Sequence, residues 1–333
     1  MFIKRMACPG VSIKELYLGS IINVYSRQLK LVEYGDMFTR RQFEASSEKT
    51  FAMIKPDCYT QTGKIINEIY RNGFTISKLK MSKFLRPQLA EQFYQEHQGK
   101  PFFSDLCAFM QSDVVTGMEL VSDNAIAKFR DCMGPKQTSS SIQEAKQMAP
   151  NSLRALFGTD GMRNAVHGSG SASEFNTEKS MFFSPAFAPT AAFNNCTCCI
   201  IKPHIIQEGL AGHVIDMILQ EGFEISSMEM FTLDRPTAEE FFEVYKGVLP
   251  EFVGMIEHMT SGPCIVMEVR QENAVQSFRD LCGPMDPEIA KNLRPNTIRA
   301  KFGHTRTVNA VHCTDLHEDG CLEVEYFFSI QQQ

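Results

Sequence analysis

Several features that define other classes of protein are missing from this sequence. There is no run of about 18 or more apolar residues, the length that a membrane-spanning helix needs. Residues 1–11, MFIKRMACPGV, lack the apolar stretch of a secretory signal peptide. We therefore expect a cytoplasmic chain with no membrane partner.

An excess of basic charge is missing as well. The 333 residues include 33 Lys and Arg against 39 Asp and Glu, so the formal net charge is −6. A nucleic-acid-binding surface requires clustered positive charge, and we expect no nucleic-acid partner. The 11 cysteines are interpreted as buried, reduced thiols rather than a disulfide framework, because they are scattered along the chain.

The main feature that is present is an internal repeat of about 135 residues. Five blocks recur in the same order. TFAMIKPD (50–57) returns as TCCIIKPH (197–204), RNGFTISKLKM (71–81) as QEGFEISSMEM (220–230), FRDCMGP (129–135) as FRDLCGP (278–284), SLRALFG (152–158) as TIRAKFG (297–303), and NAVH (164–167) as NAVH (309–312). The repeat predicts an N-terminal segment at 1–48, a first copy at 49–183, a Pro- and Ala-rich linker at 184–195 and a second copy at 196–330.

The apolar patterns predict similar secondary structure in the two copies. In the first copy, a short apolar strand ends at Pro56 and an amphipathic helix ends at 72–73, before a strand that starts at 74. A further helix opens at Pro87, residues 106–120 are predicted as a strand with a turn, and residues 124–130 as a helix. We interpret the whole as a βαββαβ-like pattern, which predicts an α/β (α+β sandwich) fold with an antiparallel sheet. Residues 1–48 are predicted to form two or three strands of a small β-rich module.

Each copy also carries the residue types of a phosphate-transfer site: a lysine at a strand end, arginines in two separate blocks, an asparagine and a histidine. Guanidinium groups pair well with phosphate oxygens, which points to a polyphosphate ligand. No GxxxxGK[ST] motif occurs, so a P-loop does not hold the phosphates. A histidine beside such cations indicates covalent phosphoryl transfer through the imidazole.

The blocks IKPD, KPFF, FR…GP, LRALFG and NAVHGS resemble the nucleoside diphosphate kinase family over about 130 residues of each copy. The resemblance implies two tandem ferredoxin-like domains, with ATP as phosphate donor and Mg²⁺ held mainly by the nucleotide phosphates rather than by a protein metal site. His167 matches the phosphorylated nucleophile, Lys55 the lysine on the transferred phosphate, and Tyr94 the tyrosine beside that lysine. The remaining matches are Arg130 and Arg154 for the terminal phosphates, Asn164 for the ribose side, Phe102 for the base, and Ser169 with Glu178 for orienting the histidine.

The first copy departs from the family pattern in a few places. Lys100 stands where an arginine is usual, and Gly161 replaces an apolar residue beside the base. The family's threonine after the GP turn is not cleanly placed, and Lys136 or Thr138 are alternatives. The segment 136–151 is longer than usual. These changes affect the expected nucleotide affinity and oligomer packing more than the chemistry.

The second copy departs further around a retained set of residues. By spacing, Glu243 falls at the tyrosine position, Glu251 replaces the base-stacking phenylalanine, and Cys313 and Thr314 follow the histidine. We expect this copy to be weak or inactive. The retained residues are Lys202, Arg279, Arg299, Asn309, His312 and Glu323.

Three functional hypotheses follow, and they are not exclusive. The first is a nucleoside diphosphate kinase that transfers the γ-phosphate of ATP to nucleoside diphosphates by a ping-pong route through phospho-His167. The second is a structural component of microtubule-based structures, because the tandem arrangement behind a β module is similar to a centrosomal and axonemal branch of the family. That similarity implies tubulin or the γ-tubulin ring complex as partners and the centrosome or cilium axoneme as location. The third is a protein-histidine kinase or nucleotide sensor.

Overall fold

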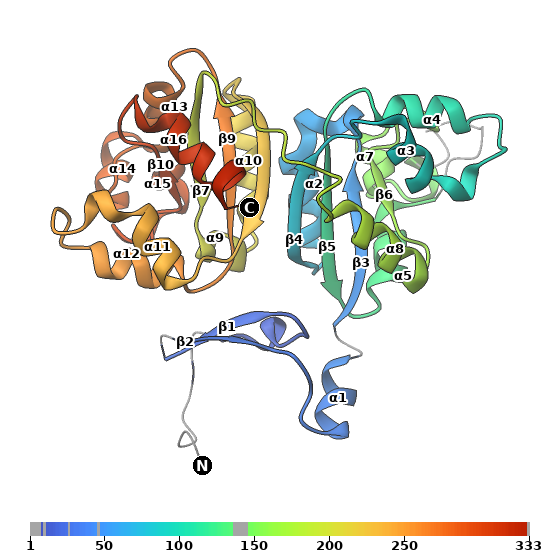
Figure 1. The fold of residues 1–333 in the computed structure, drawn as a ribbon, viewed down its shortest axis with the longest axis horizontal. Coiled ribbons are helices and arrows are strands. Elements are labelled where there is room, and N and C mark those ends of the chain that lie inside the picture. The colour runs from blue at the N-terminus through green and yellow to red at the C-terminus, as the bar shows by residue number, and fades with distance from the viewer. Residues whose placement is uncertain (1–7, 9–10, 26, 45–46, 136–145, 332–333) are drawn as a thin grey trace.

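The structure is a computed structural model that describes residues 8, 11–25, 27–44, 47–135 and 146–331. It contains two lobes side by side, with a small N-terminal module beneath them (Figure 1). We call β3 to α8 domain A and β7 to η5 domain B. Among the described residues, no helix is both long and apolar enough to cross a bilayer.

Domain A alternates strands and helices in the order expected. Its strands are β3 (Glu48–Ile54), β4 (Thr75–Ser82), β5 (Val115–Ser122) and β6 (Val166–Gly168). Its helices are η2 (Pro56–Gln61), α2 (Thr62–Arg71), α3 (Pro87–Phe93), η3 (Gln95–His97), α4 (Phe103–Met110), α5 (Ala125–Met133), α7 (Leu153–Phe157) and α8 (Ala172–Phe182).

Domain B repeats this order. Its strands are β7 (Cys196–Ile201), β8 (Glu224–Phe231), β9 (Cys264–Arg270) and β10 (Val311–Cys313). Its helices are α9 (Pro203–Gln207), α10 (Ala211–Gln220), α11 (Arg235–Phe241), η4 (Glu243–Tyr245), α12 (Phe252–Met259), α13 (Ala274–Cys282), α14 (Pro287–Leu293), α15 (Ile298–Phe302), α16 (Asp319–Glu325) and the π-helical turn η5 (Tyr326–Ile330).

The strands of both domains form one continuous antiparallel sheet, in the order β10-β7-β9-β8-β4-β5-β3-β6. Each half therefore has its strands in the order fourth, first, third, second, which is the ferredoxin-like order. The halves join where Lys80 of β4 pairs with Glu229 of β8. Antiparallel pairing and the α+β fold class are confirmed, and the outermost strands are the short β6 and β10.

Helices α2 and α10 pack against each other across the domain boundary (Figure 1). Two glycines at matching positions permit this approach. A Cβ added to Gly63 would lie 2.5 Å from the carbonyl oxygen of Gly212, and one added to Gly212 would lie 2.4 Å from the carbonyl oxygen of Gly63. The apolar faces of these helices merge into one core cluster, which contains Ile66 from domain A and Ile215 from domain B. Burial of this shared layer stabilises the two domains as one unit.

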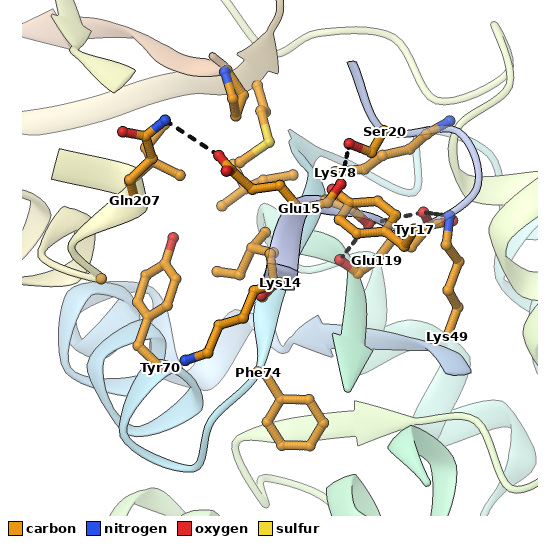
Figure 2. Close-up of a pocket in the computed structure, with 18 of the residues that line it drawn as sticks. Lys14, Glu15, Tyr17, Ser20, Lys49, Tyr70, Phe74, Lys78, Glu119 and Gln207 are labelled. Atoms are coloured by element: carbon orange, nitrogen blue, oxygen red, sulfur yellow. Dashed lines mark hydrogen bonds and ion pairs between the residues drawn. The ribbon is translucent and has the colours of Figure 1, made fainter. Parts of the chain in front are cut away.

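The N-terminal module contacts both domains. Lys49 donates to the carbonyl of Leu18 at 3.0 Å and lies 5.2 Å from the ring of Tyr17, while Gln207 of domain B donates to Glu15 at 3.3 Å. A cavity of about 1200 Å³ lies between this segment and the two domains (Figure 2). The segment therefore bridges the two domains.

Two predictions about secondary structure need correction. The module contains the hairpin β1 (Ile21–Val24) and β2 (Arg27–Lys30), as expected, but also the turn η1 (Ile13–Glu15) and the helix α1 (Met37–Glu44). Asp36 accepts a hydrogen bond from the backbone of Thr39 at 2.6 Å, a capping contact that favours a helix start. In domain A, residues 106–110 are helical rather than extended, because Leu106, Cys107 and Met110 form the buried face of α4.

The cysteines are free thiols, as interpreted, and eight of the 11 are buried. Cys196 and Cys199 have the spacing of a CxxC motif. They point to opposite faces of strand β7, because side chains alternate along a strand. They belong to different core clusters, so this spacing does not bring the two sulfur atoms together.

Candidate active site

His167 lies on edge strand β6, where it pairs with Met53 of β3. Its Nε2 is 2.6 Å from Oε1 of Glu178, a buried carboxylate on α8. The hydroxyl of Ser169 donates to the other carboxylate oxygen. A carboxylate on Nε2 fixes the proton there and leaves the lone pair of Nδ1 available for attack.

The backbone before this histidine is strained. Ala165 has φ +69°, and the amide of Val166 donates back to the carbonyl of Asn164 at 2.8 Å. A residue other than glycine at positive φ costs energy that the surrounding structure must supply. Here the amide of Lys55 donates to the carbonyl of Ala165 at 2.9 Å. This contact ties the end of β3 to the turn that leads into His167.

Lys55 follows strand β3 and is 7% exposed. Its ammonium donates to Oδ1 of Asn164 at 2.6 Å and to the carbonyl of Met162 at 3.2 Å. Burial, and then the nearby Arg154, lower the pKa of Lys55 to about 8. Lys55 and Asn164, predicted from separate blocks, are therefore in direct contact.

The two predicted arginines approach from α5 and α7. Arg154 is 5% exposed and donates to the carbonyl of Gly134 at 2.8 Å, and burial together with Arg130 lowers its pKa to about 10. Arg130 is exposed and donates to the carbonyl of Gly170 at 3.5 Å. In the part of the chain that the structure describes, neither these arginines nor Lys55 form an ion pair. The three cations therefore create local positive charge that an anionic ligand would neutralise.

Aromatic side chains line the histidine and the outer part of the site. The rings of Phe93 and Tyr94 lie 5.4 and 5.6 Å from the imidazole. The hydroxyl of Tyr94 is buried without a hydrogen-bond partner among the described residues, and a bound ligand could form a hydrogen bond with it. Phe102 is 45% exposed at the start of α4, and the ammonium of Lys100 lies 5.8 Å from its ring. Its exposure fits a stacking surface better than a core position.

Domain B retains part of this arrangement. His312 Nε2 lies 2.8 Å from Glu323, and the hydroxyl of Thr314 donates to the same carboxylate at 2.9 Å. The ammonium of Lys202 donates to the carbonyl of Thr307 at 3.0 Å, and burial lowers its pKa to about 7. Arg299 donates to the carbonyl of Gly283 at 2.9 Å, as Arg154 does to Gly134.

Other contacts in domain B differ. Asn309 donates to the carbonyls of Met285 and Arg306 at 3.0 and 2.9 Å, and no hydrogen bond links it to Lys202 among the described residues. Arg279, the counterpart of Arg130, forms an ion pair with Asp315.

The family model for nucleoside diphosphate kinase matches residues 48–187 and again 195–332. The chain belongs to the nucleoside diphosphate kinase family. It is 48% identical to nucleoside diphosphate kinase homolog 7 of Rattus norvegicus, over 99% of this chain and 83% of that protein. The corresponding protein of Mus musculus is 46% identical over the same shares. The nucleoside diphosphate kinase of Aquifex aeolicus is 36% identical over 40% of this chain and 93% of that protein.

One prediction about the second kinase domain is wrong. Spacing placed Glu243 at the position of Tyr94, but Phe242 is there. Both Tyr94 and Phe242 cap their helices, and the Phe242 ring lies 5.3 Å from the imidazole of His312. Both helices have seven residues, but the proline is the first residue of α3 and the second residue of α11, so Phe242 lies one residue nearer to its proline than Tyr94 does. Domain B therefore lacks a counterpart of the Tyr94 hydroxyl but keeps an aromatic ring beside its histidine.

The sequence comparison also missed two charged residues in the second kinase domain, Asp315 and Arg306. The signal was available in the aligned blocks, because Asp315 stands at the position of Gly170 and Arg306 at that of Gly161. The alternatives Lys136 and Thr138 lie outside the described residues. The cavity between the N-terminal segment and the two domains is lined by none of the predicted site residues, so it is separate from the candidate site.

Proposed function

We propose that domain A is a nucleoside diphosphate kinase site that transfers the γ-phosphate of ATP to other nucleoside diphosphates through phospho-His167. The observation that carries this proposal is the contact between Nε2 of His167 and Glu178, beside three cations without ion-pair partners among the described residues. A histidine with a fixed tautomer next to surplus positive charge suits attack on a phosphate.

The reaction has two half-steps through the same atom. The Nδ1 lone pair of His167 forms a bond to the γ-phosphorus of ATP, and the bond from that phosphorus to the bridging oxygen breaks, so ADP leaves. The imidazole becomes positively charged and keeps the proton on Nε2. This N–H stays hydrogen-bonded to the Glu178 carboxylate, whose negative charge stabilises the imidazolium. A terminal phosphate oxygen of a second nucleoside diphosphate then attacks the phosphorus, and the neutral histidine leaves.

The cations and Phe102 would position the nucleotide in both half-steps. Arg130 and Arg154 come from different helices and can hold different phosphate oxygens, while Lys55 reaches the phosphate next to the histidine. The exposed ring of Phe102 would stack on the base. The base is thus recognised by its flat face, so different nucleoside diphosphates would be accepted.

Mg²⁺ would bind through the phosphates of the nucleotide. No group of three or more His, Cys, Asp or Glu is placed to hold a metal ion in the described ranges. A bound Mg²⁺ would neutralise phosphate oxygens and help the leaving oxygen depart. The residues of this chain fit that arrangement because their contribution is cationic side chains that bind phosphate.

Domain B would be weak or inactive under this proposal. It retains His312 and Glu323, but an acidic residue, Glu251, caps α12 where Phe102 caps α4. A carboxylate offers no stacking face, and it repels the phosphates of a nucleotide.

Incubation of the full chain with γ-labelled ATP and Mg²⁺ tests both parts. Acid-labile label is expected on the wild type and on the His312→Ala variant, and its loss is expected with His167→Ala. Label that persists in His167→Ala at the wild-type level would contradict the assignment of domain A. An unlabelled wild type would leave only a non-catalytic role.

We propose, second, that the chain is also a component of microtubule-based structures, at the centrosome or the cilium axoneme. The support is the tandem architecture, in which one domain has lost site residues and both are joined as one unit. A domain that retains its fold after losing its catalytic contacts favours a structural role for that domain. Co-sedimentation of the full chain with assembled microtubules tests this, and a chain that stays in the supernatant at micromolar tubulin would contradict it.

A further inference from the structure

A carboxylate of the chain itself occupies the phosphate side of the domain B site. Asp315 forms an ion pair with Arg279, the arginine that corresponds to Arg130 of domain A. Arg279 also donates to the carbonyl of Thr314 at 3.4 Å. In domain A the matching position is Gly170, which offers Arg130 only a backbone carbonyl at 3.5 Å. The arginine available for phosphate in domain A is therefore neutralised in domain B.

A second contact fixes this carboxylate. The hydroxyl of Tyr245, at the end of η4, donates to Oδ2 of Asp315 at 2.6 Å. Burial would raise the pKa of Asp315, but the hydrogen bond from Tyr245 and the Arg279 guanidinium outweigh it and hold the pKa below its ordinary value. Asp315 thus remains ionised and held from two sides, as a bound phosphate would be.

The base side of domain B is closed by another internal ion pair. Arg306 lies 2.8 Å from Glu251 and joins the segment before β10 to the start of α12. The matching residues of domain A are Gly161 and Phe102. Domain A has a glycine and an exposed ring at these two positions, whereas domain B has two charged side chains that pair with each other.

The histidine behind these contacts keeps the orientation found in domain A. His312 lies 2.8 Å from Glu323 and His167 lies 2.6 Å from Glu178, and the flanking aromatic rings are at similar distances. The histidine is thus oriented as in domain A, while Arg279 and Arg306 are each paired with a carboxylate of the chain.

We propose that Asp315 is the residue that excludes nucleotides from domain B, acting as an internal substitute for a nucleotide phosphate on Arg279. The Arg306–Glu251 pair adds a second barrier on the base side. His312 therefore retains the ability to accept a phosphate when the internal carboxylate is removed. This inference rests on the proposed phosphohistidine chemistry of domain A.

The experiment uses the full chain in a His167→Ala background, so that acid-labile label from γ-labelled ATP reports on domain B. Adding Asp315→Gly is expected to raise that label at least about tenfold, since a hydrogen-bonded charge that competed for Arg279 is gone. Asp315→Asn keeps the side-chain size without the charge, and it is expected to raise the label in the same direction. His312→Ala added to Asp315→Gly should abolish it.

Glu318→Gln in the same background is the matched control. Glu318 is an exposed carboxylate three residues further on, without a side-chain ion pair among the described residues, and its removal should leave the label unchanged. A rise with Glu318→Gln equal to that with Asp315→Gly would overturn the proposal, because the effect would then follow net charge alone.

The reciprocal change tests the same idea in domain A. Gly170→Asp in a His312→Ala background is expected to lower the label on His167 at least about tenfold, while Gly170→Ala, which adds bulk without charge, should lower it much less. The number of fluorescent ADP analogue molecules bound per chain gives a readout independent of phosphoryl transfer. One is expected for His167→Ala, because domain A keeps its cations and Phe102, and two are expected for His167→Ala/Asp315→Gly.

The outcomes separate the two proposals. No label on the wild type, with a second bound analogue gained in the Asp315→Gly chain, would remove the phosphohistidine chemistry of both domains and keep the role of Asp315 in excluding nucleotides. A labelled wild type, with neither label nor analogue binding gained by Asp315→Gly or Asp315→Asn, would overturn the role of Asp315 alone.

Discussion

The close approach of helices α2 and α10 predicts that one added methyl group at Gly63 destabilises the protein. A Cβ at this position would lie 2.4 Å from the backbone nitrogen of Asp216 and 2.5 Å from the carbonyl oxygen of Gly212. Both neighbours are backbone atoms, so rotation of a side chain cannot relieve the contact. The two helices would have to separate by about 1 Å to restore ordinary van der Waals distances.

The size of the effect follows from two opposing contributions. Overpacking in a close-packed interior costs about 1–3 kcal/mol, and a contact with rigid backbone belongs at the upper end of that range. Replacing glycine by alanine in a helix returns up to about 1 kcal/mol through helix propensity. We therefore expect Gly63→Ala to lower the free energy of unfolding by about 2 kcal/mol.

Equilibrium unfolding in urea, followed by far-ultraviolet circular dichroism, measures this change. Gly212→Ala should cost a similar amount, because its Cβ would lie 2.4 Å from the carbonyl oxygen of Gly63. The double variant should cost less than the sum of the two, since one separation of the helices accommodates both methyl groups. Gly35→Ala is the control, because no atom lies within 4 Å of a Cβ at that position. A loss with Gly63→Ala no larger than that with Gly35→Ala would refute the reasoning.

Three further predictions concern catalysis. Glu178→Gln should slow phosphorylation of His167 by about 10- to 100-fold, since a hydrogen bond to a charged group contributes about 1.5–3 kcal/mol. Rapid-quench labelling measures this rate, and an equal loss with Glu323→Gln would contradict the prediction. Because the pKa of Lys55 is lowered to about 8, its charge is present below that pH and lost above it. In a pH–rate profile, kcat/KM should therefore fall as the pH rises through about 8. The Lys55→Arg variant, although less active, should not show this fall. Phe102→Ala should weaken binding of a fluorescent ADP analogue by about 1–3 kcal/mol through lost stacking, and unchanged affinity would exclude the ring as the base platform.

The internal repeat allowed much of domain A to be anticipated from residue types and spacing. The contact between His167 and Glu178 was expected from the resemblance to the family, and the same spacing of 11 residues recurs between His312 and Glu323. The strand and helix order of each copy followed from apolar periodicity. The helix α4 was not recognised, and its residues 106–110 were predicted as extended, since a short apolar segment fits a strand and a helix equally well.

The missing parts depend on contacts between distant segments. The ion pair of Asp315 with Arg279 and its hydrogen bond from Tyr245 join three elements of domain B, and no local pattern marks them. The counterpart of Tyr94 was misplaced by one residue, because the proline begins α3 at its first position but stands at the second position of α11. The single continuous sheet was also not predicted. The residues that let the two domains approach each other are single glycines, Gly63 and Gly212, within two amphipathic helices.

The order of strands in the shared sheet has a consequence for self-association. An unpaired strand edge is a template on which another chain can add a strand and begin to aggregate. In this sheet β4 and β8 lie side by side and pair at one position, Lys80 with Glu229, so each domain lies against one long edge of its neighbour. The two edges that remain are the three-residue strands β6 and β10, which are too short to template much pairing. Fusion of two copies in one chain thus protects long strand edges at any protein concentration, even when the chain is too dilute for separate copies to associate.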